Sequence, residues 1–413
     1  MKNVYLDHAA TTPIDPRVLK AMLPFFNEKF GNPSALYQKG REALNAISGA
    51  RKFVAQVFGC SAGEIIFTAG GTESDNLAIL GAARANRAQG NHIITTKIEH
   101  HAVLHACEQL EKEGFKVTYL PVDAEGFVTT EQVLKAITPQ TILVSVMFAN
   151  NEIGTIEPVA EIGNALKKNH PHIIFHTDAC QAAGALDLNV NRLHVDLLTL
   201  NGSKIYGPKG VGVLFKKRGV KIQPLIFGGE QEFALRPGTE NTAGIIGLVT
   251  ALELAQKNKD KENKRLIGLR NYLWAKLQKA VPKIKLNGPE PDLPAEEAGA
   301  AAKNLKRLPN NLNITILDIE GEALLLYLDE VGIQAATGSA CTSESLEPSH
   351  VIRALGVPYE FAHGSLRFSL GHSNNKQQID YLIKVLPGIV SKLREISPVN
   401  LDVCNPNKHA KYK

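Results

Sequence analysis

Residues Asp196–Gly212 read DLLTLNGSKIYGPKGVG, and this stretch indicates how the rest of the chain is organised. Leu197–Leu200 predicts a short buried strand, and a polar turn follows it. In open α/β proteins, loops at strand ends carry the functional residues. Lys204 lies in such a loop, among glycines that let the backbone approach closely. A lysine held there, partly out of water, can form an imine with an aldehyde. A lone loop lysine is more often simply solvated, so the interpretation depends on the other motifs.

The same strand-then-loop pattern occurs four times before this stretch. It is found in EIIFTAGGTESDNLAIL (64–80), HIITTKIEHHAVLHACEQL (92–110), TILVSVMFANNEIGTIEP (141–158) and HIIFHTDACQAAG (172–184). We expect strands at 65–67 and 93–95, and a third strand that ends at Asn150–Asn151. Continuous apolar strands that alternate with helices predict an α/β fold with a mostly parallel sheet covered on both faces. The polar residues then meet at the carboxyl edge of that sheet.

The remaining segments predict further helices and a second α/β region. Helices are expected at about 17–30, 40–58 and 244–281. A strand at 311–321, a helix at 322–330, a strand at 365–371 and a closing helix at 376–396 follow. The intervening stretch 286–310 is rich in Pro, Ala, Glu and Lys, which predicts an exposed excursion. The polar end of the chain after 397 is expected to be loosely held.

Composition limits the classes of function. The chain has 413 residues and a net charge of +5, which gives no sign of nucleic-acid binding. No run of about 18 apolar residues is present to span a membrane, and the first residues do not resemble a signal peptide. Five cysteines without paired spacing are typical of a reducing compartment. We therefore expect a cytoplasmic protein.

The loop residues match what a pyridoxal phosphate enzyme requires. Such an enzyme needs a lysine for the aldehyde, an acid for the ring nitrogen, donors for the phosphate and a basic group for the substrate carboxylate. Lys204, Asp178, the Gly71–Thr72 turn at a helix start and Arg367 can fill these roles. Taken alone, Asp178 would more often be a helix cap, and the glycine turn would more often be a plain strand-to-helix corner.

Histidines 92, 100, 101 and 105 allow two interpretations. Two of them share a helix face, but no HExxH motif or acidic partner accompanies them, so we expect no metal site. His100 follows a strand end, where it could stack on a flat cofactor or transfer protons.

Cys341 differs from the other cysteines in its surroundings. It lies in ATGSACTSESLEPSH, among small and polar residues that indicate an exposed, flexible loop. A single cysteine of this kind is a candidate nucleophile. Cys60, Cys107 and Cys180 lie among apolar residues or on helix faces, and we expect them to have core roles.

Nine motifs together resemble the cysteine desulfurases, in particular their long-loop, NifS/IscS-like group. In order they are YLDHAATTP, GNPSAL, FTAGGTESDNLAI, EHHAVL, ANNEIGTI, FHTDACQAAG, SKIYGPKG, RPGTEN and GSACTSESLEPSHVIRALG. The resemblance covers nearly the whole chain. It implies the pyridoxal-phosphate-dependent transferase fold of type I, similar to aspartate aminotransferase, and a homodimer. It also implies a large cofactor domain at 15–260 and a small domain made of 1–14 and 261–413, with the catalytic cysteine loop at about 335–350.

The resemblance implies a cofactor role for most of the candidate residues. Lys204 matches the Schiff-base lysine and Asp178 the partner of the ring nitrogen. His100 matches the histidine that stacks on the ring and transfers protons. The other matches are Gln181 and Asn151 near the phenolic oxygen, Gly71 and Thr72 at the phosphate, and Thr239 reaching the phosphate of the neighbouring subunit.

The resemblance also implies how substrate and sulfur are handled. Arg367 matches the arginine that binds the substrate carboxylate, with help from Asn151, and Cys341 matches the cysteine that accepts sulfur. The expected reaction removes sulfur from L-cysteine, gives L-alanine and leaves a persulfide on Cys341. A mobile loop then passes that sulfur to acceptor proteins, such as an iron–sulfur scaffold.

Four features depart from the family pattern. Ser203 stands where a histidine usually precedes the lysine, although its hydroxyl can still donate to the phosphate. Asn201 replaces a common serine, the excursion at 287–308 is longer than usual, and the tail differs from the usual scaffold-docking end. The alternatives left open are a selenocysteine lyase, an aminotransferase, or a non-catalytic sulfur-relay partner.

Overall fold

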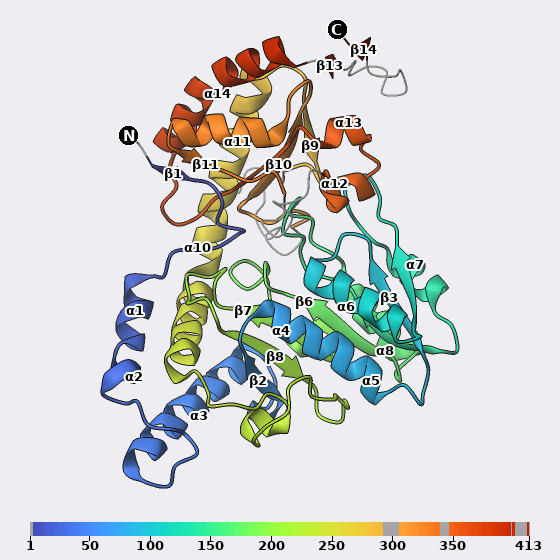
Figure 1. Ribbon diagram of the computed structural model, residues 1–413, viewed down its shortest axis with the longest axis vertical. Coiled ribbons are helices and arrows are strands. Elements are labelled where there is room, and N and C mark those ends of the chain that lie inside the picture. Colours follow the sequence, from blue (N-terminus) through green and yellow to red (C-terminus); the bar gives the residue numbers. More distant parts are fainter. Residues whose placement is uncertain (1–2, 292–304, 339–346, 398, 401–410, 413) are drawn as a thin grey trace.

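The protein consists of two parts joined by one long helix (Figure 1). The computed structural model describes residues 3–291, 305–338, 347–397, 399–400 and 411–412. The helix, α10 (Thr242–Ala280), runs from the lower part into the upper part. The lower part contains the large sheet, and the upper part contains the smaller ones.

The large sheet has seven strands in the order β2-β8-β7-β6-β5-β3-β4. Only β8 runs antiparallel to its neighbours. The central strands are almost entirely buried, and they contribute aliphatic residues such as Ile94, Leu143 and Leu198 to the core. This arrangement confirms the predicted α/β class with a mostly parallel sheet. The strands are β2 (Ile65–Thr68), β3 (His92–Thr96), β4 (Lys116–Leu120), β5 (Thr141–Ser145), β6 (Ile174–Asp178), β7 (Leu197–Asn201) and β8 (Gly212–Lys216).

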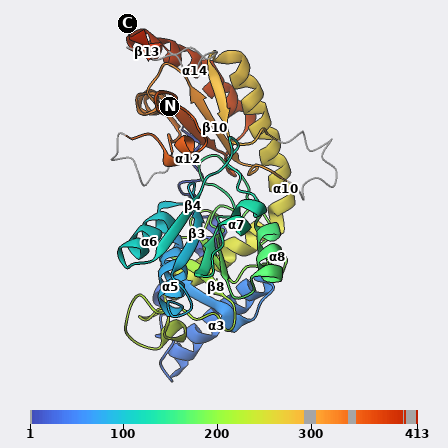
Figure 2. The same cartoon turned by 90° about the vertical axis from the view of Figure 1, so that its right-hand side faces the viewer.

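Helices cover both faces of this sheet (Figure 2). Alternate strand residues pack to opposite sides: Ile94 and Leu198 belong to one core, whereas Ile93 and Leu197 belong to cores on the other side. The first side is covered by α1 (Pro16–Met22), α3 (Gln38–Phe58), α7 (Thr130–Ala136), α8 (Val159–Asn169), α9 (Val190–Leu193) and the start of α10. The second is covered by α4 (Gly71–Asn76), the π-helical turn Leu77–Gly81, α5 (Ala82–Ala85) and α6 (His101–Lys112).

The upper part is built on the antiparallel sheet β12-β10-β9. Its core combines these strands with the second half of α10 and with two helices, α11 and α14. The N-terminal strand β1 pairs in parallel with β11 in this part. The elements are β1 (Val4–Tyr5), β9 (Ile284–Asn287), β10 (Asn311–Ile316), α11 (Gly321–Glu330), β11 (Ile333–Gln334), α12 (His350–Ala354), α13 (Tyr359–Ala362), β12 (Ser365–Ser369), α14 (Lys376–Ile396), β13 (Val399–Asn400) and β14 (Lys411–Tyr412).

The expected domain boundaries stay a prediction. Helix α10 passes through 260/261 without a break, so the chain itself marks no boundary there. Two large cores nevertheless lie at its two ends, one with Leu248 and one with Leu273.

Three expectations about local structure are wrong: two concern where an element ends, and the third concerns the burial of the 286–310 stretch. The helix predicted at 17–30 is broken into α1 and α2 (Pro24–Asn27), because proline lacks an N–H group and disrupts the preceding turn. Strand β5 ends at Ser145, before Asn150, although Val146 and Phe148 still donate hydrogen bonds to β6 carbonyls.

The predicted exposed excursion is buried at both ends. Asn287 lies in β9, and Arg307 is fully buried and donates to the carbonyls of Ile153 and Asn287. An arginine with several carbonyl partners can be buried at an acceptable energetic cost. Residues 292–304 lie outside the described part of the chain.

Within the described residues, no helix has the length and apolar character needed to cross a bilayer.

Packing around α10 predicts that two leucine-to-alanine substitutions differ in their effect on the free energy of unfolding. Leu273 on α10 is fully buried, whereas Leu326 on α11 is 72 % exposed. We expect Leu273→Ala to lower the free energy of unfolding by about 2–5 kcal/mol. The matched variant Leu326→Ala should change it by less than about 0.5 kcal/mol. Urea denaturation followed by circular dichroism measures both, and equal effects would contradict this packing.

Candidate active site

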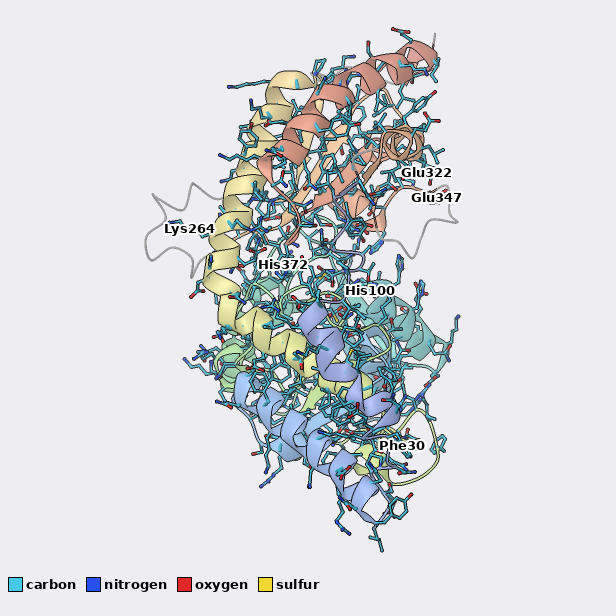
Figure 3. The ribbon with its side chains drawn as sticks, turned by 90° about the vertical axis from the view of Figure 1, so that its left-hand side faces the viewer. Phe30, His100, Lys264, Glu322, Glu347 and His372 are labelled. Carbon is cyan, nitrogen blue, oxygen red and sulfur yellow. The ribbon has the colours of Figure 1, made fainter. Side chains whose placement is uncertain are left out.

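A cavity of about 210 Å³ lies between the carboxyl edge of the large sheet and the upper part. Eight of the sequence-predicted site residues line it: Gly71, Thr72, His100, Asn151, Asp178, Gln181, Lys204 and Arg367. Figure 3 shows His100 in this region between the two parts. The structure thus brings together residues that are up to 296 positions apart in the chain, from Gly71 to Arg367.

Three other predicted residues are not among those that line the cavity. Ser203 is partly buried in the Lys204 turn, and its carbonyl accepts hydrogen bonds from Thr12. Thr239 is exposed on the segment before α10. Cys341 lies outside the described residues.

The phosphate-type turn lies at the start of α4, which continues through the π-helical turn into α5. Gly70 has a φ of 154°, which is favourable only for glycine. A Cβ atom on Gly71 would lie 2.8 Å from Cys180 Sγ, so the turn packs directly against the end of β6. The first N–H groups of the helix have no partner within it and can bind an anion.

Lys204 follows β7 and reaches the carbonyl of Ala10 with its amine. Burial lowers the pKa of the Lys204 ammonium. A lower pKa raises the fraction of free amine, which is the form that reacts with an aldehyde.

Asp178 ends β6, and its carboxylate accepts a hydrogen bond from Cys180 N–H at 2.8 Å. The neighbouring Asp75 is buried, and burial together with the charge of Asp178 raises its pKa strongly. Burial lowers the pKa of His176 to about 3, so its contact with Asp75 at 3.6 Å joins two neutral groups. Asp178 and Asp75 both line this end of the cavity.

Arg367 on β12 is 99 % buried and spans both parts of the molecule. It donates to the carbonyl of Asn151 at 2.9 Å and forms an ion pair with Asp7 at 2.6 Å. Its Nε is buried without a partner among the described residues. A buried guanidinium with an unused donor at a cavity wall is suited to bind a carboxylate.

His100 caps α6, and its Nδ1 accepts a hydrogen bond from Ala102 N–H at 3.1 Å. A neutral ring therefore carries its proton on Nε2.

Cys180, expected in the core, is buried but also lines the cavity. Burial raises the pKa of its thiol strongly, and burial raises the pKa of Cys60 to about 12. Both remain protonated thiols at neutral pH and are poor nucleophiles.

Sequence reasoning missed two acidic residues of the site, Asp7 and Asp75. Both stand inside quoted motifs, YLDHAATTP and TESDN, but nothing in the sequence pairs Asp7 with an arginine 360 positions away. Among the described residues, no group of three or more His, Cys, Asp or Glu side chains is arranged to hold a metal ion.

The residues fit pyridoxal phosphate on evidence from the cavity itself. Two buried polar atoms without a hydrogen-bond partner among the described residues belong to side chains that line it: Asn201 Oδ1 and Arg367 Nε. Buried polar groups normally have partners, so the cavity is built for a polar ligand. The lysine, the aspartate and the helix start are the donors and acceptors that this cofactor requires.

Comparison with known proteins places the chain in a family. The aminotransferase class-V model matches residues 4–382. The chain therefore belongs to the aminotransferase class-V family, whose members generally depend on pyridoxal phosphate.

Within that family the chain belongs with the cysteine desulfurases. It is 54% identical over 398 residues to the cysteine desulfurase IscS of Clostridium botulinum (strain Hall), covering 96% of this chain and 97% of that relative. A solved NifS-like protein superposes with a TM-score of 0.86 at 37% identity, covering 95% of this chain and all of the other. The structure described as SspA in complex with cysteine has a TM-score of 0.74 at 35% identity, covering 89% and 98%.

Glu99 gives a prediction about how the stability of the folded protein depends on pH. It lies directly before His100 and is fully buried, and burial raises the pKa of its carboxyl from 4.5 to about 8. The folded state therefore binds a proton that the unfolded state releases between these pH values, and stability falls as pH rises through this window. The slope for one proton is at most about 1.4 kcal/mol per pH unit.

We expect Glu99→Gln to remove this part of the pH dependence. The amide oxygen can still accept from Thr96 and from Met147 N–H, as the carboxyl does. Urea midpoints for both proteins between pH 5 and 8 measure the difference. Parallel curves for the two proteins would show that Glu99 is ionised throughout.

Proposed function

We propose that the protein removes sulfur from L-cysteine, giving L-alanine and a persulfide on Cys341, with pyridoxal phosphate as its cofactor. The sulfur then passes to acceptor proteins for iron–sulfur cluster assembly and other sulfur-containing products. The observation that carries the proposal is the single cavity lined by Lys204, Asp178 and Arg367. The chain has five cysteines without paired spacing, which supports a cytoplasmic location.

Each wall of the cavity would hold one part of the cofactor. Lys204 would hold the aldehyde carbon, Asp178 the proton on the ring nitrogen, and the start of α4 with Thr72 the phosphate. Gln181 would act near the phenolic oxygen; its amide also donates to Ala9 at 3.0 Å. When bound, the cofactor supplies an electron sink that stabilises negative charge at the substrate Cα.

Arg367 and Asn151 would orient the substrate. The free Nε of Arg367 can bind the carboxylate, while Asp7 and the Asn151 carbonyl fix the guanidinium. Lys204 would act as the base that takes the Cα proton, and His100 would move protons at the same cavity.

The flanks of the Cys341 segment support its role. Ser349 donates to Glu152 at 2.5 Å, and Gly338 lies close to the same carboxylate. Glu152 follows Asn151, so both flanks meet the large part beside the cavity. The thiolate of Cys341 would attack the substrate sulfur, forming an S–S bond as the Cβ–S bond breaks. The electron pair stays on the substrate carbon, which is protonated to give alanine.

We also propose a homodimer. Large apolar side chains are exposed in the segment 23–37, which connects α1 to α3 and contains α2, and in the loop after β8; they are Leu23, Phe26, Phe30, Leu36, Tyr37 and Phe227. Several large apolar side chains exposed within one short segment are typical of an interface. Thr239 lies on an exposed segment and does not line its own cavity, which leaves it available to a neighbouring subunit's site.

Cys341 provides the test of the chemistry. After brief incubation with L-cysteine and alkylation of thiols, we expect the Cys341 peptide to be heavier by one sulfur atom, with alanine released. Cys341→Ser should lower the rate of alanine formation at least about 100-fold while keeping the visible absorbance of the bound cofactor.

Cys60→Ser is the matched control and should keep full activity, because the Cys60 thiol stays protonated at neutral pH. Alanine without persulfide on Cys341 would move sulfur acceptance elsewhere. Neither product, from protein that visibly holds its cofactor, would contradict the proposal and favour transamination.

The homodimer predicts a specific effect of charge on its surface. Phe30 is 63 % exposed near the end of the large part (Figure 3). We expect Phe30→Asp to weaken dimerisation about tenfold or more, since burying a new carboxylate is costly. Leu326→Asp, exposed on α11, should have no effect. Sedimentation velocity measures both, and a monomeric parent protein at micromolar concentration would contradict the dimer.

A further inference from the structure

The loop between β8 and α10 contains an unusual run of backbone conformations. Glu232, Phe233 and Ala234 have φ values of 47°, 60° and 57°, all in the left-handed region. None of the three is glycine, so each is strained there. A strained run of this kind persists only when surrounding contacts hold it, and it is typical of functional segments.

The first contact that holds the loop is a buried ion pair. The Glu232 carboxylate accepts from Arg51 at 2.7 and 2.5 Å and from Phe67 N–H in β2 at 2.9 Å. The guanidinium of Arg51 lies within 4.9 Å of the Phe67 ring centroid and 5.2 Å of the Phe233 ring centroid. The pair is bidentate and mostly buried, which fixes its geometry.

The second contact reaches the predicted phosphate turn. Arg236 Nε donates to Glu73 Oε1 at 3.1 Å, and Glu73 Oε2 accepts from Ala69 N–H at 3.1 Å. Glu73 is the third residue of α4, so its side chain closes the Ala69–Thr72 turn. Its negative charge therefore lies beside the turn that would bind the phosphate.

Arg236 acts from outside the cofactor cavity. It is not among the residues that line that cavity, and instead borders a separate space of about 30 Å³ together with Ala69, Glu232 and Glu240. In Figure 1 this loop lies beside β2, below the turn that leads into α4.

We propose that Arg236 is a positioning residue for the phosphate-binding turn. Its guanidinium neutralises the charge of the Glu73 carboxylate, and the Glu232–Arg51 ion pair holds Arg236 in place. Glu73 can then shape the turn through Ala69 without repelling the phosphate. The inference rests on the proposed function, because it requires the cofactor phosphate at the start of α4.

The test compares two aldehydes that differ only in the phosphate. Apo-protein is titrated with pyridoxal phosphate and with pyridoxal, and binding is followed by visible absorbance. We expect Arg236→Met to raise the Kd of pyridoxal phosphate about tenfold, the size of effect that one charge can have at a partly buried helix start. The Kd of pyridoxal should change less than about twofold.

A second substitution separates charge compensation from direct contact. In the double variant Arg236→Met with Glu73→Gln, the Kd of pyridoxal phosphate should return to within about threefold of the parent value, since no uncompensated carboxylate remains. If Arg236 touched the phosphate itself, the double variant would stay weak, and the proposal would be wrong. An equal loss for both aldehydes, or no loss at all, would also overturn it.

Glu73→Gln alone provides an independent test if Arg236→Met does not fold. The amide oxygen keeps the hydrogen bond to Ala69 N–H, so pyridoxal phosphate should bind as tightly as in the parent or more tightly. Selective weakening of pyridoxal phosphate in this variant would contradict the proposal. Arg192→Met, which removes an exposed ion pair with Asp187, is the control and should leave both Kd values unchanged.

These measurements do not depend on turnover. A parent protein that binds neither aldehyde would refute the proposed function together with this inference. A parent that binds both, with variants that fail the pattern above, would refute the inference and leave the proposed function intact.

Discussion

Thr12 makes the contact on which the active site depends. Its N–H and its hydroxyl both donate to the carbonyl of Ser203 at 2.9 Å, and its hydroxyl accepts from Tyr206 N–H at 2.8 Å. These bonds hold the turn on both sides of Lys204, including the left-handed backbone of Tyr206 at φ 65°. The N-terminal segment that provides Thr12 also supplies Asp7, the partner of Arg367. One short segment therefore sets the lysine of the large part and the arginine of the upper part relative to each other.

The charges in the cavity are arranged so that few groups remain ionised. Burial keeps Asp75 and His176 neutral and lowers the pKa of Lys204. The ion pair with Asp7 offsets the cost of burying the Arg367 guanidinium. A charged substrate therefore meets a guanidinium whose position is fixed by its ion pair with Asp7 and its hydrogen bond to the Asn151 carbonyl.

Much of the fold and of the site follows from local sequence. Strands β3 and β7 are buried and contain the aliphatic residues on which their prediction rested, and the closing helix spans 376–396 as predicted, with Asn375 as its N-cap. Local patterns failed where a neighbour in space decided the outcome. Arg307 looked exposed because it lies in a polar, proline-rich stretch, but carbonyls from residues 153, 287 and 289 hold it in the interior. Pro24 was an available signal for the helix break that we did not use.

The sequence by itself determined the class of fold, the lysine loop and eight of the residues that line the cavity, because strand burial and turn chemistry are read from neighbouring residues. The tertiary structure alone decided the pairing of Asp7 with Arg367, the neutral state of Asp75 and the link from Arg236 through Glu73 to the phosphate turn. Each of these depends on burial or on contacts between segments far apart in the chain. No local pattern encodes these contacts, since they arise only when segments far apart in the chain pack together.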